Sequence, residues 1–168
     1  STRSSPQGGE HGYDAGKKVK GRKRHLVVDT LGLLLAVVVT SASVQDRAAA
    51  GQALAQAQER TGHTIQTLYA DSAYAGKVAA VMAHEQQVKV QIIRRVPSWR
   101  WDDAQQSLWE EMITMPILPK RWVVERSHAW LEKCRRLTMH HDRTPRAATA
   151  WAWLAQARML MTRLAQAV

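Results

Sequence analysis

Two acidic residues stand where a carboxylate could meet a metal ion and a phosphate. Asp71 lies in "LYADSAY", at the end of a predicted strand and beside small residues that leave room for ligands. Glu125 lies in "KRWVVERSHAWLEKCRR", which predicts a helix. Carboxylate oxygens are the donors that hard cations such as Mg²⁺ prefer. Each residue also has an ordinary structural interpretation: Asp71 could accept hydrogen bonds from turn amides, and Glu125 could pair with Arg121 on the helix surface.

A basic segment precedes the first long apolar run. The stretch "KKVKGRKRH", residues 17–25, holds six Lys or Arg in nine residues. Such a density of cations favours phosphate binding, with a solubilising tail as the alternative. The alternation predicts one strand face made of Lys18, Lys20, Arg22 and Arg24. The candidate contacts to nucleic acid are Lys17, Lys18, Lys20, Arg22, Lys23, Arg24, Arg121 and Arg126.

Composition agrees with a polyanionic partner. The 168 residues are 45% hydrophobic, which predicts one domain with a real core. Lys and Arg outnumber Asp and Glu by 24 to 14, a net charge of +10 that points first to nucleic acid and second to an anionic membrane surface. The longest uncharged apolar stretch, Leu31 to Val44, is shorter than the ~20 residues of a spanning helix. The single cysteine, Cys134, excludes an intrachain disulfide and fits a reducing cytoplasm.

The order of predicted elements indicates a mixed α/β sheet. Residues 1–16 are rich in Ser and Gly and predict a flexible basic arm, and residues 17–168 predict one domain. Strands are predicted at 26–28 and 33–40 as a hairpin, then up to Asp71, and at 88–95; helices are predicted at 47–62, 76–87, 122–137 and from 145 onward. Asp46 is the expected N-cap of the first helix. Residues 96–119 receive no assignment.

The last two helices each show an apolar stripe at helical spacing. The expected buried side of the first comprises Val123, Ser127, Trp130, Cys134 and Leu137, which leaves Glu125 on another face. The expected packing side of the second comprises Ala150, Leu154, Ala157, Met161, Leu164 and Val168. Familiar phosphate and zinc motifs are absent from the sequence, because no Walker-type glycine loop and no HExxH spacing occurs.

Three blocks of the sequence resemble the transposases of bacterial insertion sequences, specifically the insertion-sequence-five group with DDE chemistry. They are "GYDAGKKVKGRKRHLVVDTLGLLLAVVVTSASVQDRAAA", "LYADSAYAG" and "RWVVERSHAWLEKCRRL", in the family's order, and the resemblance runs from Gly8 to about Leu164. It implies a ribonuclease-H-like fold, in which helices flank a mixed sheet. Residues 17–168 would then be part of a DDE catalytic domain.

The resemblance implies three catalytic carboxylates, of which two have a match. Asp71 matches the second and Glu125 the third, and Arg121 matches the arginine of the family's Tyr-Arg-Glu-Lys helix signature. The sequence departs from that signature in two places, with Leu118 in the place of Tyr and Glu132 in the place of Lys. The implied ligands of Mg²⁺ or Mn²⁺ are therefore Asp71 and Glu125.

The first carboxylate of the family lies on a strand just ahead of the segment that matches residues 1–16. We therefore expect an N-terminally truncated member, without the first strand and without the first catalytic Asp. Asp14 and Asp29 belong to other blocks of the resemblance and do not replace it.

The implied function is DNA transposition by metal-assisted phosphoryl transfer: DNA binding, strand cleavage and strand transfer. The expected partner is double-stranded DNA, both element ends and target, bound by a homodimer in the bacterial cytoplasm, in association with the nucleoid. The activity of the chain itself stays open, because one carboxylate is missing. The alternatives are a non-catalytic DNA-binding remnant, a metal-dependent DNA nuclease, and a basic RNA-binding module.

Overall fold

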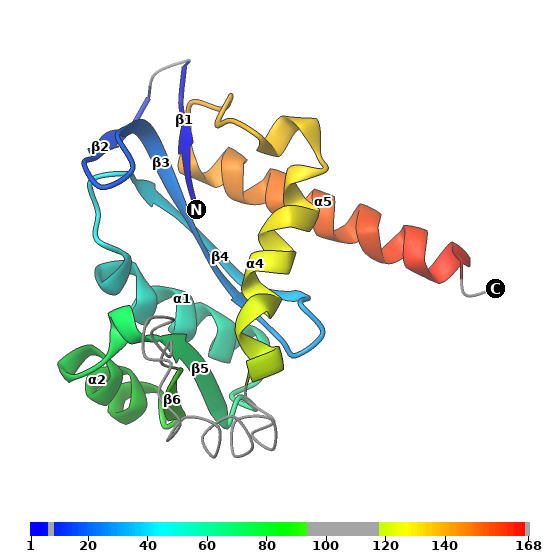
Figure 1. Ribbon diagram of the computed structural model, residues 1–168. Helices are drawn as coiled ribbons and strands as arrows, with labels where there is room; N and C mark the ends of the chain where they lie inside the picture. Colours follow the sequence, from blue (N-terminus) through cyan, green and yellow to red (C-terminus); the bar gives the residue numbers. More distant parts are fainter. Residues whose placement is uncertain (7–8, 94–117, 167–168) are drawn as a thin grey trace, which may run out of the picture.

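The strands of the protein form two separate sheets. The structure is a computed structural model that describes residues 1–6, 9–93 and 118–166, and the side chains of 118–121 lie outside this description. The first sheet contains β1 (Thr2–Ser4), β2 (Gly12–Asp14), β3 (Val19–Val28) and β4 (Leu34–Ser41), all antiparallel to β3. The second is the parallel pair β5 (Thr67–Asp71) and β6 (Lys89–Ile93). The described strands thus form two sheets, where one mixed sheet was expected (Figure 1).

Helices join the two sheets into one body. They are α1 (Asp46–Arg60), α2 (Lys77–Gln86), α4 (Leu118–Glu132) and α5 (Pro145–Gln166), with single 3₁₀ turns at η1 (Ser72–Tyr74) and η2 (Arg135–Leu137). Helix α1 packs on β3 and β4, and α5 packs on β4. Helix α4 contacts both β3 and β5, so it bridges the sheets (Figure 1). No described helix has the length and apolar character needed to cross a membrane.

Two apolar clusters form the core. The first, between β4 and the last two helices, contains Leu34, Val37, Val39, Leu131, Leu137, Ala148 and Ala152. The second, between α1, α2 and the parallel pair, contains Leu54, Met82 and Val88. Strand β4 is buried over most of its length, as its continuous run of aliphatic residues predicts. Each sheet therefore has its own core.

Most predicted elements are confirmed, with three differences at the N-terminal end and in α1. Residues 1–16 were expected to be an arm, yet they contain β1 and β2, which pair with β3. Strand β3 begins at Val19 and not at Leu26, because the basic residues continue the strand. Asp46 is the first residue of α1, and Gln45 is the N-cap. The unassigned stretch 96–119 lies outside the described residues except at its last two positions, which begin α4.

Two of the expected DNA contacts, Arg22 and Arg24, are buried, whereas the alternation of the basic segment predicted an exposed face. They are 0% and 1% exposed. The Arg22 guanidinium donates at 2.6 Å to the backbone carbonyls of Glu10, Asp142 and Arg143. A buried guanidinium needs such acceptors, because an unpaired charge away from water is costly. Alternation along β3 therefore turns these two arginines to the interior, where they hold the segment that follows α4.

The expected buried residues Val123, Ser127 and Leu137 are confirmed, whereas the last helix packs through other residues than those expected. Helix α4 ends at Glu132 and buries Val123, Ser127 and Leu131. Helix α5 buries Ala148, Ala152 and Gln156, whereas Leu154, Met161 and Leu164 are 57%, 70% and 69% exposed. Small residues let α5 approach the sheet closely, and its C-terminal half projects beyond the sheets (Figure 1). The expected packing stripe of this helix is therefore wrong.

A buried histidine lies at the junction between β1 and the segment that follows α4. His140 is 1% exposed, and its Nε2 has no hydrogen-bond partner. Burial lowers the pKa of His140 to about 4, with a further lowering by Arg24 and Arg22 and a partial offset by Asp142. The imidazole is therefore neutral in the folded protein at pH 7.

The free energy of unfolding is expected to fall as the pH drops from 7 to 5. An unfolded histidine has a pKa near 6.5, whereas folded His140 has a pKa of about 4. Between these pH values, the unfolded chain therefore binds a proton at this residue and the folded chain does not. This group should remove about 2 kcal/mol at pH 5 relative to pH 7. Urea unfolding at several pH values measures the slope, and His140→Gln should make it shallower. His84→Gln, on the surface of α2, is the matched control, and equal slopes for wild type and His140→Gln would contradict the assignment.

Candidate functional site

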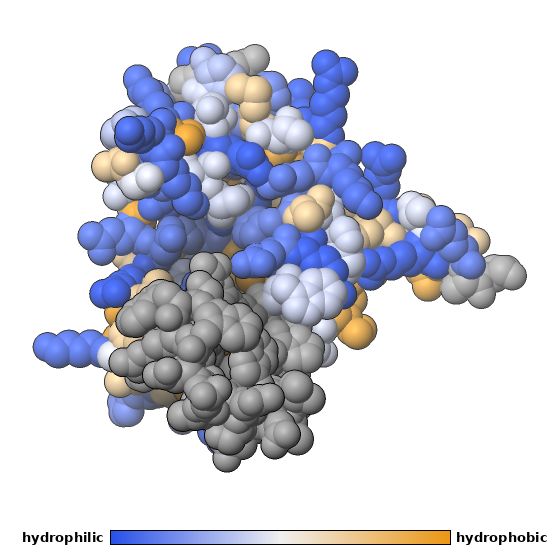
Figure 2. All heavy atoms as spheres, in the orientation of Figure 1, coloured by the Kyte–Doolittle hydropathy of each residue, from blue (hydrophilic) through white to orange (hydrophobic). Residues whose placement is uncertain are grey.

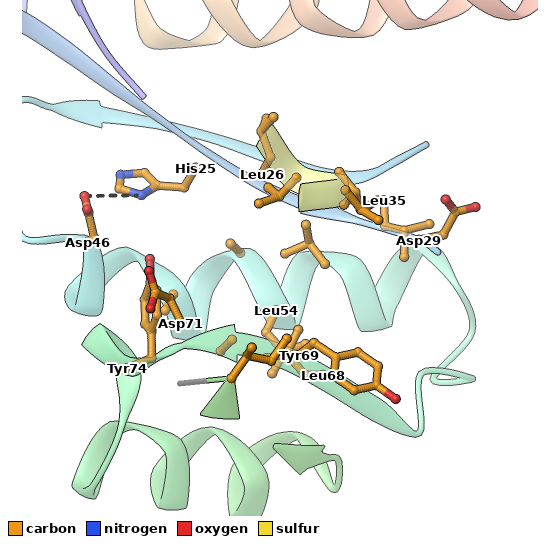
Figure 3. Close-up of a pocket in the computed structure, with 18 of the residues that line it drawn as sticks. His25, Leu26, Asp29, Leu35, Asp46, Leu54, Leu68, Tyr69, Asp71 and Tyr74 are labelled. Carbon is orange, nitrogen blue, oxygen red and sulfur yellow. Dashed lines mark ion pairs between the residues drawn. The ribbon is translucent and has the colours of Figure 1, made fainter. Parts of the chain in front are cut away.

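A cavity of about 600 Å³ lies between β3, α1, β5 and α4. The lining includes residues from both sheets and from the two helices beside them, so four distant parts of the sequence meet here. Figure 3 shows that the polar residues lie toward the two ends. His25, Asp46 and Asp71 are at one end, and Asp29 and Tyr69 are at the other. Leu26, Leu35, Leu54 and Leu68 line the middle. The cavity is thus apolar along its length and acidic at its ends.

Asp71 ends β5 as expected and lines this cavity. Its Oδ1 accepts a hydrogen bond from the Ser72 amide at 2.6 Å and another from the Ser72 hydroxyl at 3.0 Å, which caps the 3₁₀ turn η1. The side chain is nevertheless exposed. The turn interpretation of Asp71 is therefore confirmed, and the carboxylate also lines the cavity.

Glu125 reaches the same cavity from α4, and its side chain is exposed. The turn between β3 and β4 holds the helix in place. The Ser127 hydroxyl donates to the Gly32 carbonyl at 2.7 Å, and Arg126 Nη2 donates to the Leu31 carbonyl at 2.9 Å. Gly32 has φ +83°, and a Cβ there would lie 2.9 Å from Ser127 Oγ, so only glycine permits this approach. These contacts fix the rotation of α4 and with it the direction of Glu125.

Comparison with known proteins identifies the family. A family model described as the transposase DDE domain matches residues 1–160. The chain belongs to the DDE transposase family. A curated protein of Burkholderia cepacia, described as a candidate transposase for insertion sequence element IS402, is 30% identical over 129 residues, which are 73% of this chain and 54% of that protein. The chain therefore spans about half the length of the curated relative that it matches. No solved structure gives a significant match.

Two further carboxylates of this DDE domain line the cavity. Asp46 was not expected there; its Oδ1 lies 3.5 Å from Lys23 Nζ and 3.9 Å from His25 Nδ1. Asp29 Oδ1 accepts hydrogen bonds from the amides of Leu31 and Leu33 at 2.9 and 2.8 Å, so it holds the β3–β4 turn. Asp46 carried no functional signal in the sequence, because an acidic residue in the first turn of a helix usually stabilises the helix itself.

The donor chemistry of the site suits a hard cation, but the number of ligands falls short. Asp71 and Glu125 offer carboxylate oxygens to one cavity, which is the donor type that Mg²⁺ prefers. Among the residues that the structure describes, no three His, Cys, Asp or Glu side chains meet in an arrangement that could hold a metal ion. The alternative ion pair between Glu125 and Arg121 stays a prediction, because the Arg121 side chain lies outside the described residues.

Two histidines in the lining of the DDE domain carry no charge at neutral pH. Burial lowers the pKa of His25 to about 4 and that of His128 to about 3. His25 Nε2 lies 2.9 Å from Thr40 Oγ1, and His128 Nδ1 lies 3.4 Å from Ser1 Oγ. Neither histidine has a sequence signal, because isolated histidines show no spacing. Neutral imidazoles add no positive charge that would repel a cation from the carboxylates of this cavity.

The expected basic contacts of this chain divide into exposed and engaged side chains. Lys17, Lys18 and Lys20 are exposed around the start of β3, on a surface that is largely hydrophilic (Figure 2). Lys23 is engaged, since Nζ lies 3.4 Å from Asp14 and also contacts Asp46. Arg126 is engaged as well, with its guanidinium 4.3 Å from the Trp122 ring centre and 4.6 Å from that of Trp130. The exposed lysines are the better candidates for phosphate contacts.

Proposed function

We propose that this chain is part of the catalytic domain of a DNA transposase, which cleaves and joins DNA strands during the movement of an insertion sequence. The observation that carries the proposal is the placement of Asp71 and Glu125 in one cavity of a chain that belongs to the DDE family. One residue ends a strand and the other lies on a bridging helix, 15 residues long. Because the chain spans about half of its curated relative, the activity of the whole protein is part of the proposal.

Asp71 and Glu125 would hold Mg²⁺ or Mn²⁺ against the scissile phosphate. When bound, such a cation activates the attacking oxygen and stabilises the leaving oxygen of a phosphoryl displacement. The chain's own contribution is positioning: the Ser72 hydrogen bonds orient the Asp71 carboxylate, and the Ser127 and Arg126 contacts hold α4. A third carboxylate, which the described residues do not place beside these two, would complete the ligand set.

We also propose that the complete fold is ribonuclease-H-like. The support is the combination of an antiparallel unit around β3, a parallel pair β5 and β6, and a helix that crosses from one to the other. Two copies are proposed to act together, because transposition brings two DNA ends to one target. The insertion-sequence-five group is the proposed subgroup, on the three sequence blocks described above.

DNA phosphates are proposed to bind the exposed lysines Lys17, Lys18 and Lys20. Replacing all three with Gln should weaken binding to every DNA sequence alike and should reduce the slope of log K against log salt by about two to three, since each lost phosphate contact removes about 0.9. Fluorescence anisotropy with labelled duplexes at several salt concentrations measures both effects.

The matched control removes charge from other elements of the fold. Lys77→Gln with Lys89→Gln changes two exposed lysines of α2 and β6, and it should lower the slope by less than the triple variant does. An unchanged slope in the triple variant would contradict this binding surface and would leave the positive charge to other residues.

The proposed activity is tested by a strand-transfer assay on DNA that carries the element's ends, with Mg²⁺ or Mn²⁺ and with a chelator as control. Joined products that require the metal support the transposase. Cleavage without joining would favour a nuclease. Metal-independent DNA binding with neither reaction would favour a non-catalytic remnant, and a preference for RNA would favour an RNA-binding module.

A further inference from the structure

A second pocket lies between α4 and α5, outside the cavity that contains Asp71 and Glu125. It has a volume of about 280 Å³, and its lining comes from the end of α4, from Lys133 and Cys134 just after that helix, and from the second half of α5. This volume falls just below the ~300–1,000 Å³ that is typical of small-molecule sites. The pocket therefore suits one group of a larger ligand and not a complete cofactor.

The charged residues of this pocket are all cations. Lys133, Arg158 and Arg163 line it, all three are exposed, and the lining contains neither Asp nor Glu. Among the residues that the structure describes, none forms an ion pair with these three side chains, and the nearby Glu132 pairs with Arg3 instead. Positive charges without a partner around a recess attract an anion.

The ring of Trp130 holds one of these cations in place. The Arg163 guanidinium stacks over the ring, 4.2 Å from its centre, and the Arg126 guanidinium lies 4.6 Å from the same centre. Stacking occupies the flat face of a guanidinium and leaves the N–H groups in its plane available to donate. This planar fork matches two oxygens of a phosphate, and an arginine that is already oriented loses less side-chain entropy on binding.

The pocket lies on a different face of α4 from the candidate catalytic residue of that helix. Trp130 follows Glu125 by five residues, which places the two side chains about 140° apart around a helix. The pocket and the larger cavity have no lining residue in common. A phosphate bound between α4 and α5 is therefore not the phosphate whose bond would be cleaved.

The pocket is also separate from the lysine surface, which we define as the exposed residues Lys17, Lys18 and Lys20. Figure 1 shows β2 and the start of β3 at one side of the first sheet, whereas α5 passes α4 and projects beyond the other side. The pocket is lined by the part of α5 that passes α4 and begins to project. The chain thus carries two groups of exposed cations on different sides of the fold.

We propose that the pocket between α4 and α5 is a second DNA-binding site, where Lys133, Arg158 and Arg163 bind backbone phosphates of a duplex other than the one held by the lysine surface. The inference rests on the proposed function in taking DNA as the polyanion, and the place of the site follows from the charge and geometry of the pocket. Phosphate contacts of this kind position a duplex without reading its sequence. One chain then holds two DNA segments at once, as the joining of one segment to another requires.

The only cysteine of the chain lines this pocket and reports its occupancy. Cys134 is partly exposed, so its alkylation by the neutral reagent iodoacetamide can be followed by mass spectrometry. A duplex of roughly 12 base pairs offers enough phosphates for several contacts. In excess, this duplex should slow the alkylation of Cys134 by about tenfold or more. Replacing the three residues of the lysine surface with Gln should leave this protection in place, because the pocket is intact.

Replacing Arg158 and Arg163 with Glu should remove the protection, so that the duplex changes the alkylation rate by less than about twofold. Each rate is compared with and without DNA in the same variant, so a change in the reactivity of the thiol itself cancels. Arg146→Glu with Lys77→Glu is the matched control, since both residues are exposed and neither lines the pocket, and it should keep the protection. Arg163→Lys should keep only part of it, because an ammonium lacks the planar fork.

Native mass spectrometry counts the duplexes that each chain binds. The wild-type chain should bind two short duplexes, whereas the lysine-surface variant and the Arg158 and Arg163 variant should each bind one. Two duplexes on the wild type together with one on each variant support two separate sites. A single duplex on the wild type, with protection of Cys134 that is lost in the lysine-surface variant, would overturn the proposal, because one continuous surface would then bind one DNA segment.

Three further results would also overturn it: no protection of Cys134 by DNA in the wild type, full protection in the Arg158 and Arg163 variant, or equal protection by polyglutamate, which would indicate an acidic protein partner. The strand-transfer assay separates this proposal from the proposed function. Metal-dependent joining by a chain that fails these tests would leave the transposase in place and remove the second site. Two bound duplexes without any joining would keep the second site and remove the proposed activity.

Discussion

Replacing Glu125 with Gln should weaken the binding of Mn²⁺ by at least about tenfold and lower Mg²⁺-dependent strand joining by about two orders of magnitude or more. The substitution keeps the size of the side chain but removes the charge that offsets a divalent cation. Because Glu125 is exposed, the thermal midpoint should stay within about a degree of the wild-type value. Paramagnetic resonance titration of Mn²⁺ measures the affinity in the absence of DNA.

Asp71→Asn should have the same effect on metal binding, and it is a clean substitution. The remaining Asn oxygen can still accept from the Ser72 amide, so the turn after β5 keeps its cap. Glu59→Gln is the matched control, since Glu59 is exposed at the end of α1 and does not line the cavity. Wild-type affinity for Mn²⁺ in both the Glu125 and the Asp71 variants would remove these residues from the proposed site.

Replacing Arg22 with Met should lower the free energy of unfolding by about 3–5 kcal/mol, the range expected when one partner of a buried charged network is removed. Arg22 is 0% exposed, and its guanidinium serves three backbone carbonyls at 2.6 Å. Methionine fills similar space but donates nothing, so the carbonyls lose their donors away from water. Urea unfolding followed by circular dichroism measures the loss.

Arg22→Lys should recover only part of this stability, because a single ammonium cannot copy the planar fork that reaches several acceptors. Arg146→Met, at an exposed position in the first turn of α5, is the control and should change the free energy of unfolding by less than about 0.5 kcal/mol. An equally small change for Arg22→Met would contradict the prediction and would show that water can replace the guanidinium as the donor to these carbonyls.

Local patterns in the sequence predict most elements of the fold but not their assembly. The hairpin of β3 and β4, the helix α1 and the strand that ends at Asp71 follow from aliphatic runs, turn residues and helical spacing. The pairing of β1 with β3 has no such signal, because three polar residues at an edge resemble a loop. The division into two sheets likewise depends on long-range strand pairing, which the local spacing of apolar residues does not predict.

Sequence patterns singled out candidate residues of the site, but they did not predict which side chains are buried. Asp71 was singled out as a carboxylate at a strand end and Glu125 through the family resemblance, and both line the cavity. Their role stays a prediction. The burial of Arg22 and Arg24 was not predicted, because a run of cations favours exposure while strand alternation buries every second residue. In α5 the larger apolar residues suggested the buried side, whereas small residues such as Ala152 pack against β4.

The buried arginines of β3 also set an order of events during synthesis. The carbonyl of Asp142 that Arg22 binds lies 120 residues further along the chain. At a typical rate of about 5–20 residues per second, a ribosome needs several seconds or more to supply it. Until then the guanidinium groups of Arg22 and Arg24 lack their final carbonyl acceptors, so the buried face of β3 cannot complete its packing. The sheet that forms first in sequence is therefore among the last to be completed, and a nascent chain stopped before residue 142 would expose it.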